Sequence, residues 1–406
     1  MKRKALLFFL LILILITYNS NSFAFIPIWQ NLDDTTEVNA EPTNTDNFLN
    51  IESESAILIE QTTGEILYEK DPHKKLRPAS VTKIMTLLLI MEALDRGDIT
   101  LETPIPCSEK ARSMGGSQIW LNETENLSVH DMLKAICVVS ANDCTVAMAE
   151  YLAGSEELFV KMMNDKAKEL GMNDTLFKNC HGIDEDDHLT SSYDISIMSR
   201  ELLEKYPLIK DYTTIWMDSL REGKSELVNT NKLIRTYEGA TGLKTGSTSL
   251  ALYNLSASAT RNDLSLIAVI LRAPTPKLRF SEAKLLLDYG FNTYTYKQIS
   301  KKGEIVENVS VEKGSINNVN LVFENDSGVL LKKADSQEIT NETIINDNIE
   351  APISSGDILG KVNFYVNNNF IKSVSLVSQN DISKKNFINI FQIVSSNWIN
   401  LLRKKD

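Results

Sequence analysis

The hydrophobic and polar positions change period along the chain, and each change marks an expected element. Residues 55–70 contain two short β-type runs on either side of Thr63 and Gly64, which predicts a hairpin. Residues 80–95 are strong helix formers that are apolar nearly all round, so we expect this helix to lie inside a domain. Three further helices are predicted by apolar residues at helical spacing, over 129–139, 143–152 and 156–170.

A strand-like pattern replaces the helical one near residue 240. Runs of small, β-branched and aliphatic residues, separated by turn-forming residues, predict consecutive antiparallel strands at 242–249, 252–260 and 264–274. The apolar spacing of residues 281–291 then predicts a helix that closes the unit. We therefore expect one mixed unit of helices and antiparallel strands over residues 49–293.

The composition shifts again after about Tyr296, to Val, Ile, Asn, Ser and Lys in short alternating runs. This pattern predicts a separate all-β module over residues 297–380. Residues 384–406 follow, with basic residues at both ends and a run of apolar residues on one helical face: Phe387, Ile390, Phe391, Val394, Trp398, Leu401 and Leu402. We interpret this segment as an amphipathic helix that binds a membrane surface, and the alternative is a helix packed on the β module.

The N-terminus has the pattern of a secretory signal peptide. Three basic residues at 2–4 precede the apolar run Ala5–Ile16, and small residues end the segment at Ala24. A signal anchor is the alternative, but the apolar run is shorter than the ~20 residues that span a bilayer. We expect residues 1–24 to be removed and the polar residues 25–48 to be a spacer. With the amphipathic tail, this predicts an exported protein on the outer face of the cytoplasmic membrane.

Charge and cysteine content exclude several classes of function. The 406 residues carry a formal net charge of −12, so the surface should repel phosphate backbones and a nucleic-acid partner is not expected. The four cysteines show no paired spacing with histidine, and we expect no metal and no cofactor. Buried thiols are favoured over disulfides because Cys137 and Cys144 lie in apolar helical surroundings.

Ser80 and Lys83 begin the apolar helix and form the pattern S-x-x-K. A serine hydroxyl is a poor nucleophile unless a base removes its proton, and three residues along a helix bring both side chains to one face. The amine must be neutral to act as that base, although a free lysine has a pKa of about 10.4. Burial and a second cation nearby would lower it. The alternative is an N-cap serine with a surface lysine.

Two further short motifs follow Ser80 and Lys83 along the chain. Ser140, Ala141 and Asn142 form S-x-N between two predicted helices, where the alternative is a turn with Asp143 as N-cap. Lys244, Thr245 and Gly246 form K-T-G on a predicted strand, where the alternative is an edge strand with an exposed lysine. Gly246 has no side chain, so another backbone can approach it.

The three motifs in this order are the set of the β-lactamases and penicillin-binding proteins. Over residues 50–292 the chain resembles one branch, the low-molecular-weight penicillin-binding proteins that are D-alanyl-D-alanine carboxypeptidases. The likeness runs through RPASVTKIMT, GGSQIWL, SANDCTVAMAEYL, HGID, GLKTGST and AKLLLDYGF. It implies an α+β transpeptidase-like fold with an antiparallel sheet flanked by helices and a helical subdomain. The β module and the tail resemble the rest of that family's plan.

The resemblance implies a reaction and its catalytic residues. Ser80 would attack the carbonyl between two terminal D-alanines of a peptidoglycan stem peptide, and the ring carbonyl of a β-lactam inhibitor. Lys83 would be its base, and Ser140 would relay the proton to the leaving amine. Water would then hydrolyse the acyl-enzyme.

Five further residues are implied to bind the substrate: Asn142, Lys244, Thr245, Gly246 and Ser247. Asn142 would hold a peptide amide, and Lys244 and Thr245 would bind the terminal carboxylate, with Gly246 between that pair and Ser247. The positive charge of Lys244 would keep Lys83 neutral. The backbone N–H groups of Ser80 and Ser247 would form the oxyanion hole.

The chain departs from the family pattern at Ser247, where relatives vary, and at Cys180, where the family often has proline. His181 and His188 are candidate catalytic residues by type, but this mechanism needs no histidine, and we expect both to be structural. Two alternatives stay open. A class A β-lactamase would need a deacylating glutamate, for which no motif stands between Ser140 and Lys244. A catalytically inactive, penicillin-binding membrane scaffold is the other.

Overall fold

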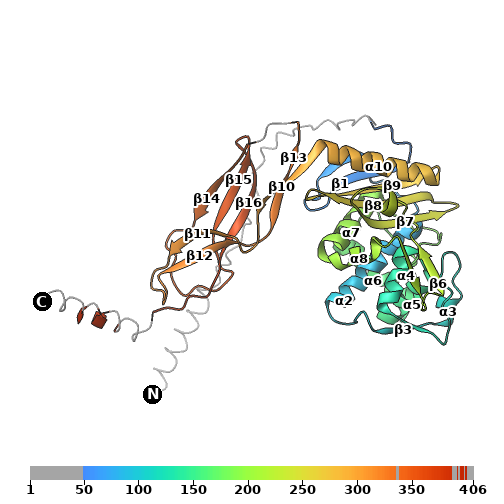
Figure 1. The fold of residues 1–406 in the computed structure, drawn as a ribbon, viewed down its shortest axis with the longest axis horizontal. Coiled ribbons are helices and arrows are strands. Elements are labelled where there is room, and N and C mark those ends of the chain that lie inside the picture. The colour runs from blue at the N-terminus through green and yellow to red at the C-terminus, as the bar shows by residue number, and fades with distance from the viewer. Residues whose placement is uncertain (1–48, 335–337, 386–390, 392–393, 397, 400–406) are drawn as a thin grey trace, which may run out of the picture. The chain divides into compact units, whose positions relative to one another are not determined.

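The computed structural model describes residues 49–334, 338–385, 391, 394–396, 398 and 399. A five-stranded antiparallel sheet organises the first unit, in the order β2-β1-β9-β8-β7 (Figure 1). Its strands are β1 (Ser55–Glu60), β2 (Ile66–Lys70), β7 (Ala240–Thr248), β8 (Leu252–Arg261) and β9 (Leu264–Ala273). The expected hairpin over residues 55–70 and the three consecutive strands after residue 240 are both confirmed.

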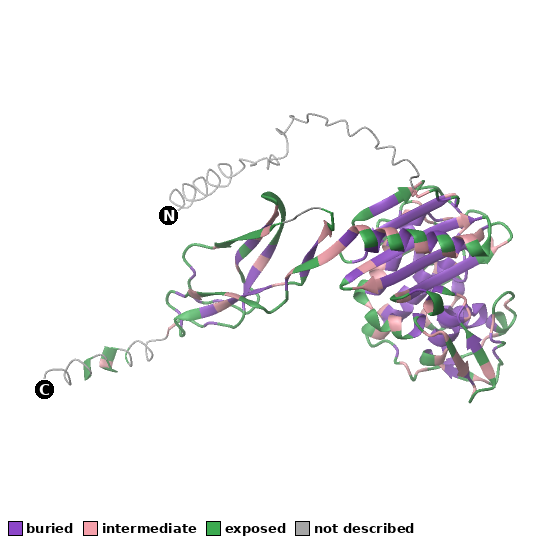
Figure 2. Cartoon of the chain, turned by 45° about the horizontal axis from the view of Figure 1, so that its top comes forward, coloured by how far each residue is buried: buried purple, intermediate pink, exposed green. Residues whose placement is uncertain are grey.

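Helices cover both faces of this sheet, with α10 (Pro276–Thr293) on one face and α7 (Ser192–Lys205) on the other (Figure 1). The strands are apolar on both sides because successive side chains point to opposite faces. In β1, Ile57 belongs to the core on the α7 side, whereas Leu58 belongs to the core under α10. Figure 2 shows these strands as almost continuously buried.

The helical region below the sheet contains the predicted apolar helix and its neighbours. Its longer helices are α2 (Lys83–Asp95), α4 (Val129–Val138), α5 (Asn142–Ala153) and α6 (Glu156–Glu169). Short elements connect them: η1 (Ala79–Thr82), α3 (Glu109–Arg112), η2 (Pro207–Ile209), α8 (Lys210–Thr213), α9 (Leu233–Thr236), and the hairpins β3 (Pro104–Pro106) with β4 (Asn126–Ser128) and β5 (Met217–Leu220) with β6 (Ser225–Val228). The predicted helices are confirmed to within two residues at either end, apart from the start of the first and the start of α10, which begins at Pro276 and not at residue 281.

The first helix differs from its prediction at the N-terminus. We expected an α-helix from Ser80, but a 3₁₀ turn, η1, covers Ala79–Thr82 and the α-helix begins at Lys83. Ala79, the first residue of η1, has a φ of +49°, in the left-handed region. The helix α7 was not predicted, because serines occupy three of its buried positions and dilute the apolar pattern: Ser192, Ser196 and Ser199.

The second unit is all-β, as predicted. Five antiparallel strands lie in the order β11-β12-β16-β15-β14: β11 (Ile305–Ser310), β12 (Asn318–Phe323), β14 (Ile339–Ile345), β15 (Ile358–Val366) and β16 (Asn369–Ser378). Alternate residues such as Leu321, Phe364 and Leu376 form its apolar core. A separate pair, β10 (Tyr294–Ser300) with β13 (Ser327–Lys332), follows directly on α10.

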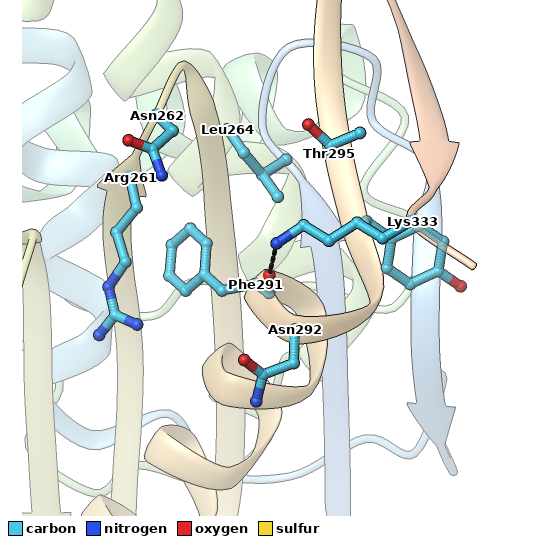
Figure 3. Close-up of a pocket in the computed structure, with 8 residues that line it drawn as sticks. Arg261, Asn262, Leu264, Phe291, Asn292, Thr295 and Lys333 are labelled. Carbon is cyan, nitrogen blue, oxygen red and sulfur yellow. Dashed lines mark hydrogen bonds between the residues drawn. The ribbon is translucent and has the colours of Figure 1, made fainter. Parts of the chain in front are cut away.

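Lys333 ties the end of β13 to the end of α10. Its Nζ donates to the carbonyl oxygen of Phe291 at 2.7 Å, and its backbone N–H donates to the carbonyl of Thr293 at 2.8 Å (Figure 3). Lys333 and Arg261 line a cavity of about 270 Å³ there. The Arg261 guanidinium lies over the Phe291 ring, 4.7 Å from its centroid, so both cations of this cavity are already engaged.

All four cysteines lie in the described part of the chain and are free thiols. Cys137, Cys144 and Cys180 are buried, as expected, and burial raises the pKa of each thiol. Cys107 is half-buried. Within the described ranges no group of three or more His, Cys, Asp or Glu side chains is arranged to hold a metal ion.

Candidate active site

Ser80 and Lys83 face each other across the η1 turn. Side chains three residues apart in a 3₁₀ turn eclipse one another, because this helix has three residues per turn. Lys83 Nζ accordingly lies 3.2 Å from Ser80 Oγ. Ser80 is partly exposed, whereas Lys83 is 0% exposed. The 3₁₀ turn therefore presents a hydroxyl to solvent with an amine directly behind it.

The Lys83 amine has two other close neighbours, and both are oxygen acceptors. The carbonyl oxygen of His181 and the side-chain Oδ1 of Asn142 each lie 2.6 Å from Nζ. A neutral amine has two N–H bonds and one lone pair. If it donates both N–H bonds to these oxygens, its lone pair is left to accept the proton of Ser80.

Burial is the largest cause that lowers the pKa of Lys83 well below its ordinary value, and the charge of Lys244 is the next. Asp143 and Cys180 act in the opposite direction. The Asp143 carboxylate is directed elsewhere, because it accepts from the backbone N–H groups of Ile119 and Leu121 at 3.1 and 3.0 Å. Lys83 thus lacks a direct carboxylate partner among the described residues, and the neutral form is favoured.

The S-x-N motif stands between α4 and α5, as predicted. Asn142 is the first residue of α5, and its Nδ2 donates to the carbonyl oxygen of Gly115 at 2.7 Å. Ser140 has a φ of +65° and is 4% exposed. Within the described chain its Oγ is buried without a hydrogen-bond partner, so it is free to accept and donate one proton. The N-cap alternative for Asp143 is wrong, because Asp143 lies inside α5.

Gly246 brings the K-T-G strand into contact with the backbone at Ser80. A Cβ at Gly246 would lie 2.8 Å from the Pro78 carbonyl oxygen and 2.9 Å from the backbone nitrogens of Ser80 and Val81. Only glycine permits this approach. Because β7 is the edge strand of the sheet, its outer backbone groups are not paired with another strand of that sheet. The exposed Ser247 follows on the same strand.

The alternative interpretation of Lys244 was an edge strand with an exposed lysine. Lys244 does lie on the edge strand β7, but it is only 1% exposed, so this alternative is wrong. Its Nζ donates to the Thr245 carbonyl oxygen at 2.8 Å. Burial lowers the pKa of Lys244 to about 7, and the nearby Arg279 charge acts in the same direction. Thr245 Oγ1 donates to Thr230 Oγ1 at 2.8 Å.

Both histidines are buried and make hydrogen bonds that fit the structural roles predicted for them. His188 Nδ1 accepts from the backbone N–H of Lys178 at 3.0 Å, so its Nε2 carries the proton toward Thr82 Oγ1 at 2.8 Å. His181 Nδ1 accepts from the backbone N–H of Ile183 at 3.1 Å. Burial lowers the pKa of each ring to about 4, so both imidazoles are neutral near pH 7.

Two residues that stand in none of the sequence motifs brace this site. Asn254 on β8 donates through Nδ2 to the carbonyls of Arg77 and Pro78 at 2.8 and 3.0 Å, which holds the chain that enters η1. Arg279 on α10 is 8% exposed and donates to the Gly246 carbonyl oxygen at 3.2 Å. Burial lowers the pKa of Arg279 to about 10. Neither residue lies in a recognisable motif, and a lone arginine in a helix carries no sequence signal.

The structure thus brings most of the predicted site together. Ser80, Lys83 and Asn142 are in contact, and Gly246 lies against the backbone of Ser80. Ser140 lies two residues before Asn142, and within the described chain its Oγ makes no hydrogen bond. The arrangement places a hydroxyl beside an amine whose neutral form is favoured, with buried basic side chains nearby. These are the groups that acyl transfer by a serine nucleophile requires.

Comparison with known proteins gives two family matches. The profile of the D-alanyl-D-alanine carboxypeptidases matches residues 39–275, and that of the penicillin-binding protein 5 C-terminal domain matches residues 294–384. The chain belongs to the D-alanyl-D-alanine carboxypeptidase family. It is 43% identical to D-alanyl-D-alanine carboxypeptidase DacF of Bacillus subtilis over 351 residues, which covers 86% of this chain and 90% of the relative.

Solved structures of this family share the fold. Penicillin binding protein 5 of Haemophilus influenzae is 30% identical with a TM-score of 0.70, covering 82% of this chain and 98% of that one. The PBP3 peptidoglycan synthesis regulatory factor of Streptococcus pneumoniae is 29% identical with a TM-score of 0.69, covering 82% and 100%. Penicillin-Binding Protein D2 of Listeria monocytogenes, solved in its ampicillin-bound form, is 29% identical with a TM-score of 0.54, covering 59% and 97%.

Proposed function

We propose that this protein is a serine-type D-alanyl-D-alanine carboxypeptidase that removes the terminal D-alanine of peptidoglycan stem peptides and is acylated by penicillin. The observation that carries the proposal is the environment of Lys83. Its amine is buried, has two acceptors for its two N–H bonds, and lies 3.2 Å from Ser80 Oγ. Family membership supports the same reaction.

The first half of the reaction forms the acyl-enzyme. Lys83 takes the proton of Ser80 as the oxygen bonds to the carbonyl carbon between the two D-alanines. The oxyanion accepts hydrogen bonds from the backbone N–H groups of Ser80 and Ser247. The proton passes through Ser140 to the leaving nitrogen, the C–N bond breaks, and D-alanine departs.

Water completes the cycle. Lys83 is neutral again after the first proton transfer and removes a proton from water as the water oxygen attacks the ester carbonyl. The bond to Ser80 then breaks and the serine regains its proton. No carboxylate is needed for this step.

The terminal carboxylate of the substrate is bound by basic and hydroxyl side chains. Lys244 and Thr245 bind the terminal carboxylate, and Arg279 adds a buried cation beside Gly246. Asn142 holds the peptide amide on the acyl side. The ammonium of Lys244 also disfavours a second charge on Lys83.

The β-lactamase alternative has less support in this site. Glu156, a buried carboxylate on α6, pairs with Lys110 at 3.0 Å and accepts from the Cys180 backbone N–H at 3.1 Å. Its oxygens are engaged there, and within the described chain it forms no hydrogen bond or ion pair with Ser80 or Lys83. A class A β-lactamase requires a glutamate that activates water beside the nucleophilic serine, and Glu156 is not placed to do this.

Mass spectrometry after brief penicillin exposure tests the nucleophile. We expect one covalent adduct on Ser80 in the native chain and none in Ser80→Ala. Ser113→Ala, at an exposed serine that caps α3, is the matched control and should still be labelled. An adduct mapped to another residue would contradict the assignment.

A D-alanine release assay on a pentapeptide separates the three functions. Release together with a long-lived penicillin adduct supports the carboxypeptidase. Rapid turnover of penicillin supports the β-lactamase, and a stable adduct without D-alanine release supports the inactive scaffold.

We further propose the organisation and location predicted from the sequence: signal peptide 1–24, spacer 25–48, catalytic domain 49–293, β domain 297–380 and membrane-binding helix 384–406. The signal peptide and spacer lie outside the described residues. In the tail, the described residues Phe391, Val394 and Trp398 are helical and exposed. In the described part of the chain, no helix is both long enough and apolar enough to cross a bilayer.

Membrane association then depends on the apolar face of the tail. Each buried large apolar side chain contributes about 1.5 to 3 kcal/mol, whereas each basic residue near anionic lipid contributes about 1 kcal/mol. We expect detergent, and not high salt, to release the protein from membranes. Release of most of it by high salt alone would contradict a hydrophobic anchor.

A further inference from the structure

A groove beside the S-x-N motif takes no part in the chemistry above. It has a volume of about 550 Å³ and is lined by residues 118–120, Val139, Arg221 and residues 224–227. We call it the Trp120 groove. Val139 directly precedes Ser140, and the loop with Trp120 contacts Asn142, so the groove adjoins the residues assigned to the acyl side of the substrate.

Trp120 presents its indole to solvent at this groove. The side chain is 75% exposed, whereas its neighbours Ile119 and Leu121 are 4% and 3% exposed. Its φ is +55°, a left-handed conformation that a bulky residue adopts only when the surrounding contacts impose it. The loop thus turns inward on both sides of Trp120 and outward at the tryptophan itself.

Two polar side chains impose this conformation. The buried Asp143 accepts from the backbone N–H groups on both sides of Trp120, at 3.1 Å from Ile119 and 3.0 Å from Leu121. From the opposite side, Arg221 donates to the carbonyls of Ile119 at 2.9 Å and Trp120 at 3.3 Å. Asp143 is the neighbour of Asn142, so the indole is positioned by the same helix start that holds the candidate substrate-binding amide.

Arg221 is itself fixed in position by an ion pair, which also neutralises its charge. It forms a two-point ion pair with Glu125, with Nε at 2.6 Å and Nη2 at 2.7 Å from the two carboxylate oxygens. The hydrogen bond to Glu125 raises the pKa of Arg221 and lowers that of Glu125. The wall of the groove formed by Arg221 is therefore fixed in position. The charges that could pair with a ligand lie on other residues of the groove.

Those available charges are Lys224 and Glu226 on the β5–β6 hairpin. Both are exposed and line the groove, and neither has an ion-pair partner among the described residues. Leu227 and Val139 add apolar surface between them and the active site. An aromatic plate, an aliphatic floor and one charge of each sign together suit a ligand with an aliphatic stem and a zwitterionic end.

We propose that the Trp120 groove binds the side chain of the residue that precedes the two D-alanines of the stem peptide, and that it favours a zwitterionic diamino acid there. The stem of this side chain lies along Trp120, its carboxylate pairs with Lys224 and its ammonium pairs with Glu226. One D-alanine separates this residue from the scissile bond, a span of about 3.3–3.6 Å per residue. The proposal rests on the carboxypeptidase function proposed above.

The test compares kcat/KM for D-alanine release from four peptides by the full mature chain. Three are N-acetylated tripeptides in which meso-diaminopimelate, lysine or norleucine precedes D-Ala-D-Ala, and the fourth is N-acetyl-D-Ala-D-Ala. We expect the native enzyme to favour the first. Trp120→Ala should lower kcat/KM for all three tripeptides by about tenfold and leave the acetylated dipeptide within about twofold.

Charge reversal tests the second half of the proposal. Lys224→Glu should lower the preference for diaminopimelate over lysine by about threefold to fivefold, since an exposed ion pair is weak. Lys168→Glu, an exposed lysine on α6 outside the groove, is the matched control and should leave the preference unchanged.

Three outcomes would overturn the proposal. One is an equal loss on all four peptides in Trp120→Ala, which would mean that Trp120 serves the loop only. Another is a native enzyme indifferent to the third side chain, or a preference that Lys224→Glu does not alter. Absence of D-alanine release from all four peptides would instead overturn the proposed function, and this proposal with it.

Discussion

The interiors of the first unit, the proposed catalytic domain, and of the β module are built from different residues. The first unit buries the charged residue types Lys83, Asp143 and Lys244. In the described part of the β module, residues 294–334 and 338–385, no charged side chain is buried, and the core is formed by side chains such as Leu321 and Phe364.

The charged groups of the described part of the module lie at its surface, and Lys313 and Glu350 form an ion pair there. Lys313 Nζ lies 2.8 Å from Glu350 Oε1, and this hydrogen bond raises the pKa of Lys313. Burial does the opposite to Lys83 and Lys244, whose pKa values are lowered. The same residue type is therefore a paired surface ion in the module and a buried amine of lowered pKa in the first unit, according to whether water reaches it. The lowered pKa is what the roles proposed for Lys83 and Lys244 require.

The largest effect is expected from removing the buried base. Lys83→Ala should lower the rate of acylation by penicillin by about 10²–10⁴-fold, because the hydroxyl loses its proton acceptor. Stopped-flow measurement with a fluorescent penicillin gives this rate. Lys313→Ala, in the module, is the control and should acylate at the native rate. An Lys83→Ala enzyme that acylates normally would remove the basis of the mechanism.

The next effect comes from two strand glycines that both lie against backbone. A Cβ at Gly246 would meet backbone atoms of Pro78, Ser80 and Val81, and a Cβ at Gly360 in β15 would lie 2.6 Å from the Ile344 carbonyl oxygen. Gly246→Ala should slow acylation about 100-fold, because a shift of about 1 Å in the site has this cost.

Gly360→Ala is the matched change in the module. It should lower the thermal stability of the chain without altering acylation by the folded enzyme. Differential scanning calorimetry and the acylation rate separate the two effects. Equal losses of activity in both variants would show that the module takes part in the chemistry.

The pH dependence of kcat/KM sharpens the comparison of the lysines. Since the pKa of Lys83 is lowered, the base is neutral above it, and activity should rise with pH through that value. Lys244 loses its charge as pH rises through about 7, so kcat/KM for the anionic peptide should fall above that pH. Each limb approaches about tenfold per pH unit.

Lys244→Arg tests the alkaline limb, because a guanidinium keeps its charge across this range. Its profile of kcat/KM should lose the fall above about pH 7 that the native enzyme has. An unchanged alkaline limb in this variant would assign that limb to another group.

The smallest effect on chemistry is expected from the module core. Phe364→Ala should destabilise the β module by about 3–5 kcal/mol, because it leaves a cavity in a packed apolar layer. The acylation rate of the folded protein should stay within about twofold. Urea unfolding measures the first quantity and fluorescent penicillin the second.

Much of the fold was predictable because its signals are local. The apolar helix α2, the hairpin of β1 and β2, and the strands β7, β8 and β9 follow from periodicity and turn residues. The helix α7 was missed because its buried serines pack against β1 and β8, through hydrogen bonds such as Ser55 Oγ to Ser192 Oγ at 2.8 Å and Ser199 Oγ to Ser256 Oγ at 2.9 Å. A hydroxyl satisfied by a distant partner looks like a surface residue in sequence.

The candidate site shows the same division. The sequence by itself singled out the residues proposed for the chemistry, since Ser80, Lys83, Asn142 and Lys244 each stand in a short motif. Only the tertiary structure decided that the Lys83 amine is shielded from water. The His181 carbonyl and the Asn142 side chain that contact it come from distant parts of the chain. A pKa depends on burial and on neighbouring charges in space, and neither is a property of residues adjacent in sequence.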